Sequence, residues 1–131
     1  MTLVLDAGAL IQVDRGDQEV LSALKAAFDR GEVVDVPTGV IGQAWRNPDR
    51  QALLSRTLKR CNEVVLDGAT ARAGGQLCGR AATSDVIDAS VALAVARARH
   101  SDEEVTLLTS DSEELAMLIS LLDTRARIIE V

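Results

Sequence analysis

Four aspartates lie at positions from which a folded chain can bring them together. Asp6 follows the apolar run Thr2–Leu5, and Asp111 closes a similar run further along the chain. An apolar strand closed by an acid is how a parallel sheet delivers charge to its carboxyl edge, where open α/β proteins bind ligands. Asp85 and Asp88 open a third, apolar segment, and their i, i+3 spacing places both on one face of a helix. We therefore expect the four carboxylates to converge.

Convergent carboxylates without matching Lys or Arg repel one another, and a hard divalent cation relieves that repulsion. Asp6, Asp85 and Asp111 also have a simpler explanation, because Asp is a good helix N-cap and is favoured there by the helix dipole. Capping does not explain Asp88, which lies one turn inside an apolar helix, where a carboxylate needs a partner. The four residues Asp6, Asp85, Asp88 and Asp111 are therefore predicted catalytic residues and ligands of Mg²⁺, with Mn²⁺ as a substitute.

Length and composition indicate one globular domain over residues 1–131. The chain is 47% hydrophobic but only 2% aromatic, so its core must be aliphatic. No secretory leader and no bilayer-spanning apolar segment is apparent, and we expect a cytoplasmic protein without a membrane partner. Cys61 and Cys78 are interpreted as reduced thiols, and a single histidine, His100, excludes a multi-histidine metal site.

Charge is distributed unevenly along the chain. The segment from Arg46 to Arg80 holds seven basic and three acidic residues, a balance of +4, so the remainder of a chain of net charge −6 carries −10. Arg46, Arg50 and Arg56 are candidate contacts to nucleic-acid phosphates on this basis. Arginines scattered over a helix surface for solubility explain the same pattern equally well.

Hydrophobic periodicity predicts strands alternating with helices. The predicted strands are Thr2–Leu5, Val33–Val36, Val64–Leu66, Val105–Leu108 and Ile128–Val131. Helices fill every gap, two of them between the second and third strands. This alternation is typical of a three-layer α/β domain with a mainly parallel sheet and right-handed crossovers.

Local signals place the helix ends. Asp17 is a predicted N-cap, Gly31 a predicted C′ residue, and Thr38 a predicted cap for the helix that follows Pro37. The last three helices are expected at about Ala71–Arg80, Asp85–Arg99 and Ser112–Leu122. The glycine-rich stretch Gly74–Gly79 lacks the flanking strand and Lys-Ser/Thr pair of a nucleotide loop, so it indicates close helix packing.

Three motifs in this order resemble those of a known family. Leu5–Leu10 resembles the first motif of PIN-domain ribonucleases, Asp85–Ala92 their third-acid helix, and Leu108–Asp111 their fourth motif. Chain length and element order are similar to those of the VapC-type toxins of bacterial VapBC toxin–antitoxin modules. The resemblance implies a sheet of order 3-2-1-4-5, Mg²⁺-dependent endoribonuclease activity, a homodimer, and inhibition by a cognate VapB-like antitoxin.

One position departs from the family pattern. The family places a Glu in the helix after the second strand, and the matching residue here is Gln43. An amide can orient a metal-bound water but neither neutralises charge nor acts as a base. Asp88 is the candidate substitute, while Thr109 and Ser110 are candidates for positioning water or phosphate through their hydroxyls.

Three functions follow from these observations. The leading one is a metal-dependent endoribonuclease toxin. The second is a catalytically weak or silent PIN-fold binding protein, which the Gln43 departure and the acidic character motivate. The third is a receiver-like or phosphatase-like domain that accepts a phosphoryl group on a strand-end Asp; against it, Lys25 and Lys59 both fall in predicted helices, not at a strand end.

Overall fold

The computed structural model describes residues 1–102 and 104–131, which contain a five-stranded, all-parallel sheet of order β3-β2-β1-β4-β5. The strands are β1 (Thr2–Leu5), β2 (Val33–Pro37), β3 (Asn62–Val64), β4 (Val105–Thr109) and β5 (Arg127–Glu130). The predicted α/β class and the strand order implied by the resemblance are confirmed. The sheet grows outward from β1 to β2 and β3, and the chain then returns to the other side of β1 to form β4, so the switch point of the sheet lies between β1 and β4.

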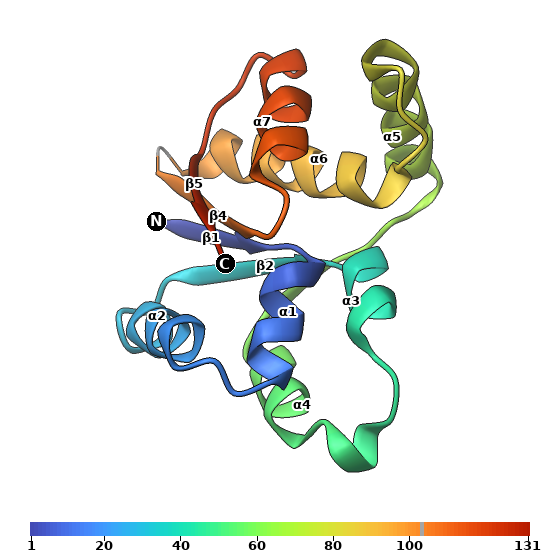
Figure 1. The fold of residues 1–131 in the computed structure, drawn as a ribbon. Coiled ribbons are helices and arrows are strands. Elements are labelled where there is room, and N and C mark those ends of the chain that lie inside the picture. The colour runs from blue at the N-terminus through green and yellow to red at the C-terminus, as the bar shows by residue number, and fades with distance from the viewer. Residues whose placement is uncertain (103) are drawn as a thin grey trace.

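Helices cover both faces of the sheet, so the three predicted layers are present (Figure 1). The helices α1, α2, α3 and α4 lie on one face, and α5, α6 and α7 lie on the other. Their bounds are α1 (Ala7–Asp14), α2 (Gln18–Asp29), α3 (Thr38–Ala44), α4 (Ala52–Leu58), α5 (Gly68–Ala81), α6 (Val86–Ser101) and α7 (Ser112–Leu121), with a short 3₁₀ turn at Pro48–Arg50. None of the helices in the described part of the chain has the length and apolar character needed to cross a membrane.

The core is aliphatic, as the composition predicts. Leu5 of β1 and Leu107 of β4 are fully buried, and α6 presents Ala89, Ala92 and Val95 to the interior. Small side chains on α6 let its axis approach the sheet closely, because helix–sheet separation depends on side-chain size. As a result, the first turn of α6 lies near the carboxyl ends of the central strands.

The third strand lies two residues earlier than predicted. The apolar run Val64–Leu66 suggested a strand there, but β3 begins at Asn62. Asn62 pairs with Asp35 of β2, and its Nδ2 donates to Asp35 Oδ1 at 2.8 Å. A buried carboxylate needs a hydrogen-bond donor, and satisfying Asp35 sets the register.

The prediction for Thr38 was wrong. The helix α3 begins at Thr38 without a side-chain cap, and Pro37 occupies the N-cap position. The Thr38 hydroxyl instead accepts a hydrogen bond from the backbone N–H of Leu66 at 3.0 Å. A contact 28 residues away along the chain thus takes the oxygen that a local cap would have used.

The other local signals hold. Asp17 caps α2 through Val20 N–H at 3.0 Å, and Gly31 follows that helix with φ of +70°. The helix α5 is longer than predicted because Asp67 caps it at Gly68. A Cβ at Gly74 would lie 3.8 Å from Ala89 Cβ of α6, which confirms close packing of these two helices.

Candidate metal centre at the carboxyl edge of the sheet

The central strands place two of the four predicted acids side by side. Leu5 of β1 pairs with Leu108 of β4, and the backbone N–H of Asp6 donates to Leu108 O at 3.2 Å. Asp6 and Asp111 therefore leave the sheet at the same edge, at the switch point between the two strands. The amino end of α6 brings Asp85 to this edge.

Three of the acids cap the helices that follow them. The Oδ1 atom of Asp6 accepts from Ala9 N–H at 3.1 Å, that of Asp85 from Asp88 N–H at 3.0 Å, and that of Asp111 from Glu114 N–H at 3.4 Å. Capping uses one carboxylate oxygen of each residue. The second oxygen of Asp111 has no hydrogen-bond donor among the described residues, whereas the Asp85 side chain also lies within hydrogen-bonding reach of the Asp88 carboxyl group. The capping and ligand interpretations are thus compatible.

Asp88 experiences the field of the other three acids. Burial raises its pKa first, and the negative charges of Asp85, Asp111 and Asp6 raise it further, to about 7. The charges of the other three acids therefore reach Asp88, and we call these four residues the acidic cluster.

Asp6 is the most buried of the four, with an exposed fraction of 5%. Burial raises its pKa, and hydrogen bonds from the Thr109 side chain and from nearby backbone N–H groups, including that of Ala9, partly oppose the rise. A buried carboxylate is costly unless donors or a cation compensate it. Here the donors compensate only in part.

Thr109 connects two of the acids. Its hydroxyl donates to Asp6 Oδ2 and accepts from the backbone N–H of Asp111 at 2.9 Å, and the side chain is fully buried. Both hydrogen-bonding functions of the hydroxyl are used by these bonds. We therefore place Thr109 behind the acids, where it orients Asp6 and Asp111, instead of in contact with water or phosphate.

Ser110 lies against the first turn of α1. A Cβ at Gly8 would collide with the Ser110 side chain and lie 3.0 Å from Ser110 N. Glycine at position 8 is thus needed for α1 and the β4–α7 connection to meet. Ser110 itself is exposed at the carboxyl edge, as a residue that positions water or phosphate would have to be.

In the described part of the chain, no positively charged group is paired with any of the four acids. Among the described residues, no Lys, Arg or terminal amine forms an ion pair with Asp6, Asp85, Asp88 or Asp111. Nor does any group of three or more His, Cys, Asp or Glu in residues 1–102 and 104–131 stand close enough to form a ready-made metal cage. Mg²⁺ commonly keeps several waters and binds through one or two carboxylates. An open cluster of uncompensated hard oxygens fits that cation.

Gln43 is exposed on α3. It lies one turn after Gly39, whose backbone lies against Ile87 of α6, so both share the face of α3 directed toward α6. Gln43 therefore lies on α3 one turn beyond the point where α3 contacts α6, the helix that carries Asp88.

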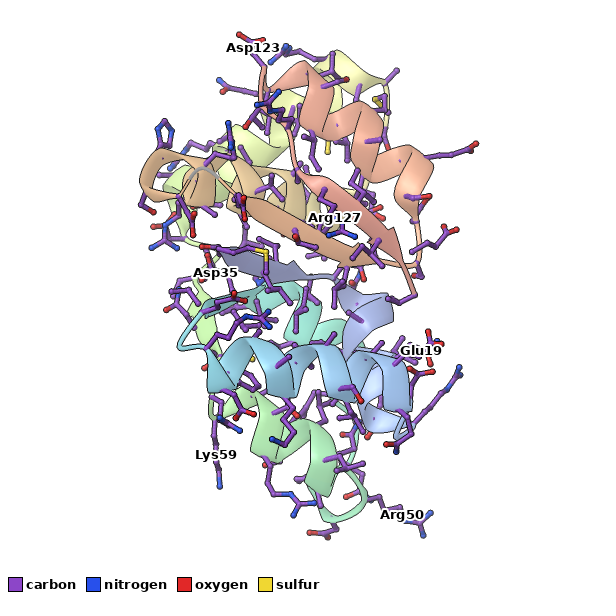
Figure 2. All side chains as sticks on the ribbon, turned by 90° about the vertical axis from the view of Figure 1, so that its left-hand side faces the viewer. Glu19, Asp35, Arg50, Lys59, Asp123 and Arg127 are labelled. Atoms are coloured by element: carbon purple, nitrogen blue, oxygen red, sulfur yellow. The ribbon has the colours of Figure 1, made fainter. Side chains whose placement is uncertain are left out.

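The three predicted RNA-contacting arginines lie apart from the acids. Arg46 Nη1 donates to the carbonyls of Gly42 and Trp45 at 3.1 and 2.7 Å, closing the carboxyl end of α3. Arg50 and Arg56 are exposed around α4, and Figure 2 shows Arg50 projecting from that end of the molecule. They form a basic surface beside α4 and are not part of the acidic cluster.

Sequence reasoning missed two neighbours of the cluster, Cys78 and Glu114. Burial, followed by the charges of Asp85, Glu114 and Asp88, raises the pKa of the Cys78 thiol. Glu114 stands three residues after Asp111, the same spacing that identified Asp88 after Asp85. That spacing was the available signal for Glu114, whereas Cys78 comes from α5 and only the packing of α5 on α6 brings it here.

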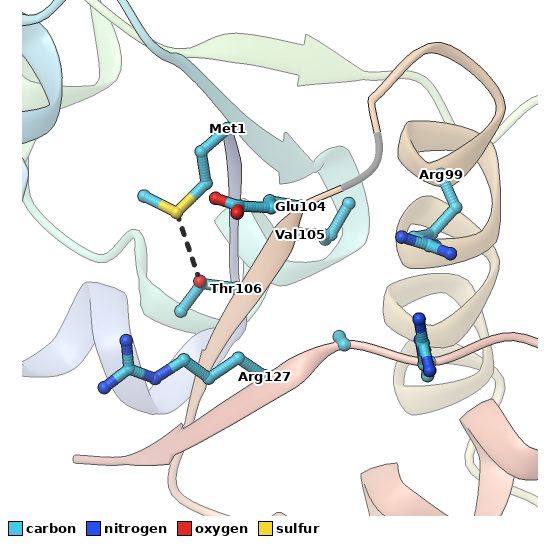
Figure 3. Close-up of a pocket in the computed structure, with 8 residues that line it drawn as sticks. Met1, Arg99, Glu104, Val105, Thr106 and Arg127 are labelled. Carbon is cyan, nitrogen blue, oxygen red and sulfur yellow. Dashed lines mark hydrogen bonds between the residues drawn. The ribbon is translucent and has the colours of Figure 1, made fainter.

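The opposite, amino edge of the sheet carries a separate cavity of about 380 Å³. Figure 3 shows Met1, Glu104 and Thr106 in it, with Arg99 of α6 and Arg127 of β5 at its two sides. This cavity is distinct from the acidic cluster, because the amino ends of parallel strands lie at the edge away from Asp6 and Asp111.

No protein-family model and no curated protein matches this sequence. A solved structure is similar over the whole chain: the crystal structure of VapBC2 from Rickettsia felis bound to a DNA fragment from their promoter. The match covers 100% of this chain and 99% of that chain, with a TM-score of 0.65 and 12% sequence identity. What the two chains share at this identity is the fold, and the chain has the predicted VapC-like PIN fold.

Proposed function

We propose that this protein is a Mg²⁺-dependent endoribonuclease in which Asp6, Asp85, Asp88 and Asp111 hold the cation. The observation that carries the proposal is the environment of Asp88, where burial first, and then the charges of Asp85, Asp111 and Asp6, raise the pKa to about 7, with no ion-paired cation on these acids among the described residues. A protein keeps such repulsion where it serves a function, because it lowers the stability of the metal-free state.

The arrangement of the residues supports phosphodiester hydrolysis. When bound, Mg²⁺ supplies a nucleophilic water and stabilises the charge that develops on the phosphate. Asp6 is fixed by Ala9 N–H and by the Thr109 hydroxyl, so its carboxylate is pre-oriented at the strand end. Thr109 ties the Asp111 backbone to the same point, which holds two ligands from distant parts of the chain in one geometry.

Labelled RNA tests this proposal directly. We expect cleavage fragments with millimolar Mg²⁺, none with EDTA, and none from Asp6→Asn with Mg²⁺. Cleavage that persists in EDTA would contradict a metal-dependent mechanism.

We also propose that the protein acts in the cytoplasm as a toxin, as a homodimer, and that a VapB-like antitoxin neutralises it. The family resemblance and the shared fold with a chain of a VapBC complex support this assignment. A partner that points an Arg at Asp6, Asp85 and Asp111 would occupy the cation position and silence the enzyme. Expression of the protein alone should then slow growth of its host, and co-expression with a small gene directly upstream should restore it.

A catalytically silent binding protein is the second candidate, and exposed Gln43 in place of a carboxylate favours it. It predicts partner binding without cleavage at any metal concentration.

The receiver-like alternative gains no support from the lysines, since Lys25 pairs with Asp29 on α2 and Lys59 ends α4. Incubation with a phosphodonor should therefore leave the protein unlabelled.

A further inference from the structure

A groove of about 460 Å³ lies between α3 and α4, away from the acidic cluster. Ile41, Trp45 and Leu58 form its apolar lining, and Lys59 lies at its wall. We call it the tryptophan groove, because Trp45 is the only tryptophan of a chain that has no tyrosine and one phenylalanine. The indole is half-buried, so it presents part of its surface to the groove.

Two basic side chains flank one side of the tryptophan groove, Lys59 in its lining and Arg56 one turn before it on α4. Lys59 follows Arg56 by three residues at the end of α4, which puts the two on neighbouring positions of one face. Neither forms an ion pair with an acid in the described residues, and Glu63 is the acid of the lining. Figure 2 shows Lys59 and Arg50 both projecting outward at this end of the molecule. In a chain of net charge −6, this side of the groove is complementary to an anionic chain.

The groove is connected to the candidate catalytic edge by one short helix. The helix α3 begins at Thr38, directly after the carboxyl end of β2, and Gly39 lies against Ile87, the neighbour of Asp88. At 1.5 Å per residue, Trp45 lies only about 9 Å along the helix axis from Gly39. A single strand a few nucleotides long can therefore reach both places.

We propose that the tryptophan groove binds single-stranded RNA, with one base stacked on the Trp45 indole and the adjoining phosphates on Lys59 and Arg56. The inference rests on the proposed ribonuclease function and names a substrate-binding surface for it. Aromatic side chains beside a basic surface bind single strands in this way, because every base has a π face and every linkage carries a charge. A neutral or basic amphipathic peptide would use the apolar lining but leave Lys59 and Arg56 without a counter-charge.

The chain contains its own probe for this contact. Since Trp45 is the sole tryptophan and tyrosine is absent, intrinsic fluorescence reports on this groove alone. Titration with an eight-residue oligoadenylate, in EDTA to prevent cleavage, should quench the emission saturably, and added salt should reverse it. Inorganic polyphosphate, an anion without bases, should leave the emission unchanged. Equal quenching by polyphosphate, or no quenching by the oligonucleotide, would overturn the proposal.

Variants separate stacking from charge. With a labelled oligoadenylate and fluorescence anisotropy, Trp45→Leu should weaken binding about fivefold or more, because it keeps an apolar side chain but removes the ring on which a base would stack. Trp45→Phe should retain most of the affinity, and it keeps the test valid if Trp45→Leu does not fold. Lys59→Glu should weaken binding and reduce its salt dependence, whereas Lys25→Glu on α2 makes the same charge change elsewhere and should do neither.

The outcomes distinguish this inference from the proposed function. Cleavage that depends on Mg²⁺ and Asp6, with Trp45→Leu binding RNA like the wild type, leaves the ribonuclease standing and refutes the groove. Binding that depends on Trp45, without cleavage under any metal condition, leaves the groove standing and refutes the catalytic proposal.

Discussion

The two ends of α6 shift the pKa of an aspartate in opposite directions. At its carboxyl end, Asp102 accepts from Glu104 N–H, from the terminal ammonium of Met1 at 3.1 Å and from the Thr2 hydroxyl at 3.0 Å, and these contacts lower its pKa. At its amino end, burial and three neighbouring carboxylates raise the pKa of Asp88 to about 7. One helix thus carries an acid whose charge is stabilised by donors and an ammonium group, and an acid whose charge is opposed by its neighbours.

The difference separates an acid that stabilises the fold from acids whose mutual repulsion no described cation relieves. Asp102 ties the amino end of β1 to the segment before β4, and its charged form is favoured in the folded state. The acids of the other edge repel each other, and that repulsion lowers the stability of the folded state. Substitutions at the amino end should therefore change activity, and substitutions at the carboxyl end should change stability alone.

The largest expected effect is on catalysis. Asp6→Asn should lower RNA cleavage at least about a hundredfold, or about 2.7 kcal/mol in transition-state stabilisation, because a fixed ligand is lost. Circular dichroism should show an intact fold, since the amide can still cap α1. Asp102→Asn is the matched control: it should lower the melting temperature and leave the cleavage rate constant unchanged. More than half of the wild-type activity in Asp6→Asn would remove this residue from the site.

Metal should stabilise only the carboxyl edge. A ligand at one hundred times its Kd stabilises the folded state by about 2.7 kcal/mol, so saturating Mg²⁺ should raise the melting temperature by several degrees. Scanning fluorimetry should show the shift in wild type and in Asp102→Asn but not in Asp6→Asn with Asp111→Asn. An equal shift in all three proteins would mean that the cation binds elsewhere.

The pH dependence of the metal-free protein should distinguish the two acids. The folded-state pKa of Asp88, about 7, lies above the ordinary value of 3.8, so its contribution to stability is lost as pH rises between these values. Asp88→Asn should therefore gain melting temperature relative to wild type from pH 4 to pH 7. For Asp102 the sign is reversed: its contribution is present above the ordinary Asp pKa and is lost at lower pH. A constant difference between Asp88→Asn and wild type across this range would contradict the cluster.

A smaller effect is expected at the position where the family pattern departs. Gln43→Glu should tighten Mg²⁺ binding a few-fold in isothermal titration and lower the melting temperature in EDTA, because another negative charge joins the edge. If Asp88 already replaces the missing carboxylate, Asp88→Asn should cost nearly as much activity as Asp85→Asn, and Gln43→Glu should add little. If neither Asp88→Asn nor Gln43→Glu changes metal affinity, the site reduces to Asp6, Asp85 and Asp111.

The smallest expected effect concerns the exposed arginines. Arg50→Glu or Arg56→Glu should lower RNA affinity and reduce the slope of log affinity against log salt by about one. The cleavage position should stay the same, because these residues lie away from the acids. Unchanged binding by both variants would identify the arginines as an ordinary solvated surface.

Much of the fold follows from local pattern. Apolar runs placed β1, β2, β4 and β5 within a residue at each end, because buried parallel strands need continuous apolar sequence. Asp17 and Gly31 located the ends of α2, since caps and positive φ are satisfied by few residue types. The strand order came from resemblance to a family and not from these patterns.

The errors share one physical cause, which is competition from distant partners. The strand β3 shifted to pair Asn62 with Asp35, and the Thr38 hydroxyl went to Leu66 instead of its own helix. Local propensities are worth fractions of a kcal/mol, so one satisfied buried polar group is enough to override them.

The sequence by itself determined which residues carry charge to the ends of strands and helices: Asp6, Asp85, Asp88 and Asp111. Local spacing sets this, because Asp6, Asp85 and Asp111 each cap the helix that follows and Asp88 lies three residues after Asp85 in the first turn of α6. Only the tertiary structure decided that the Thr109 hydroxyl bridges Asp6 and Asp111, because that bond joins atoms 103 residues apart. Contacts of this kind depend on which strands become neighbours, and burial of the whole core, not any one segment, selects that arrangement.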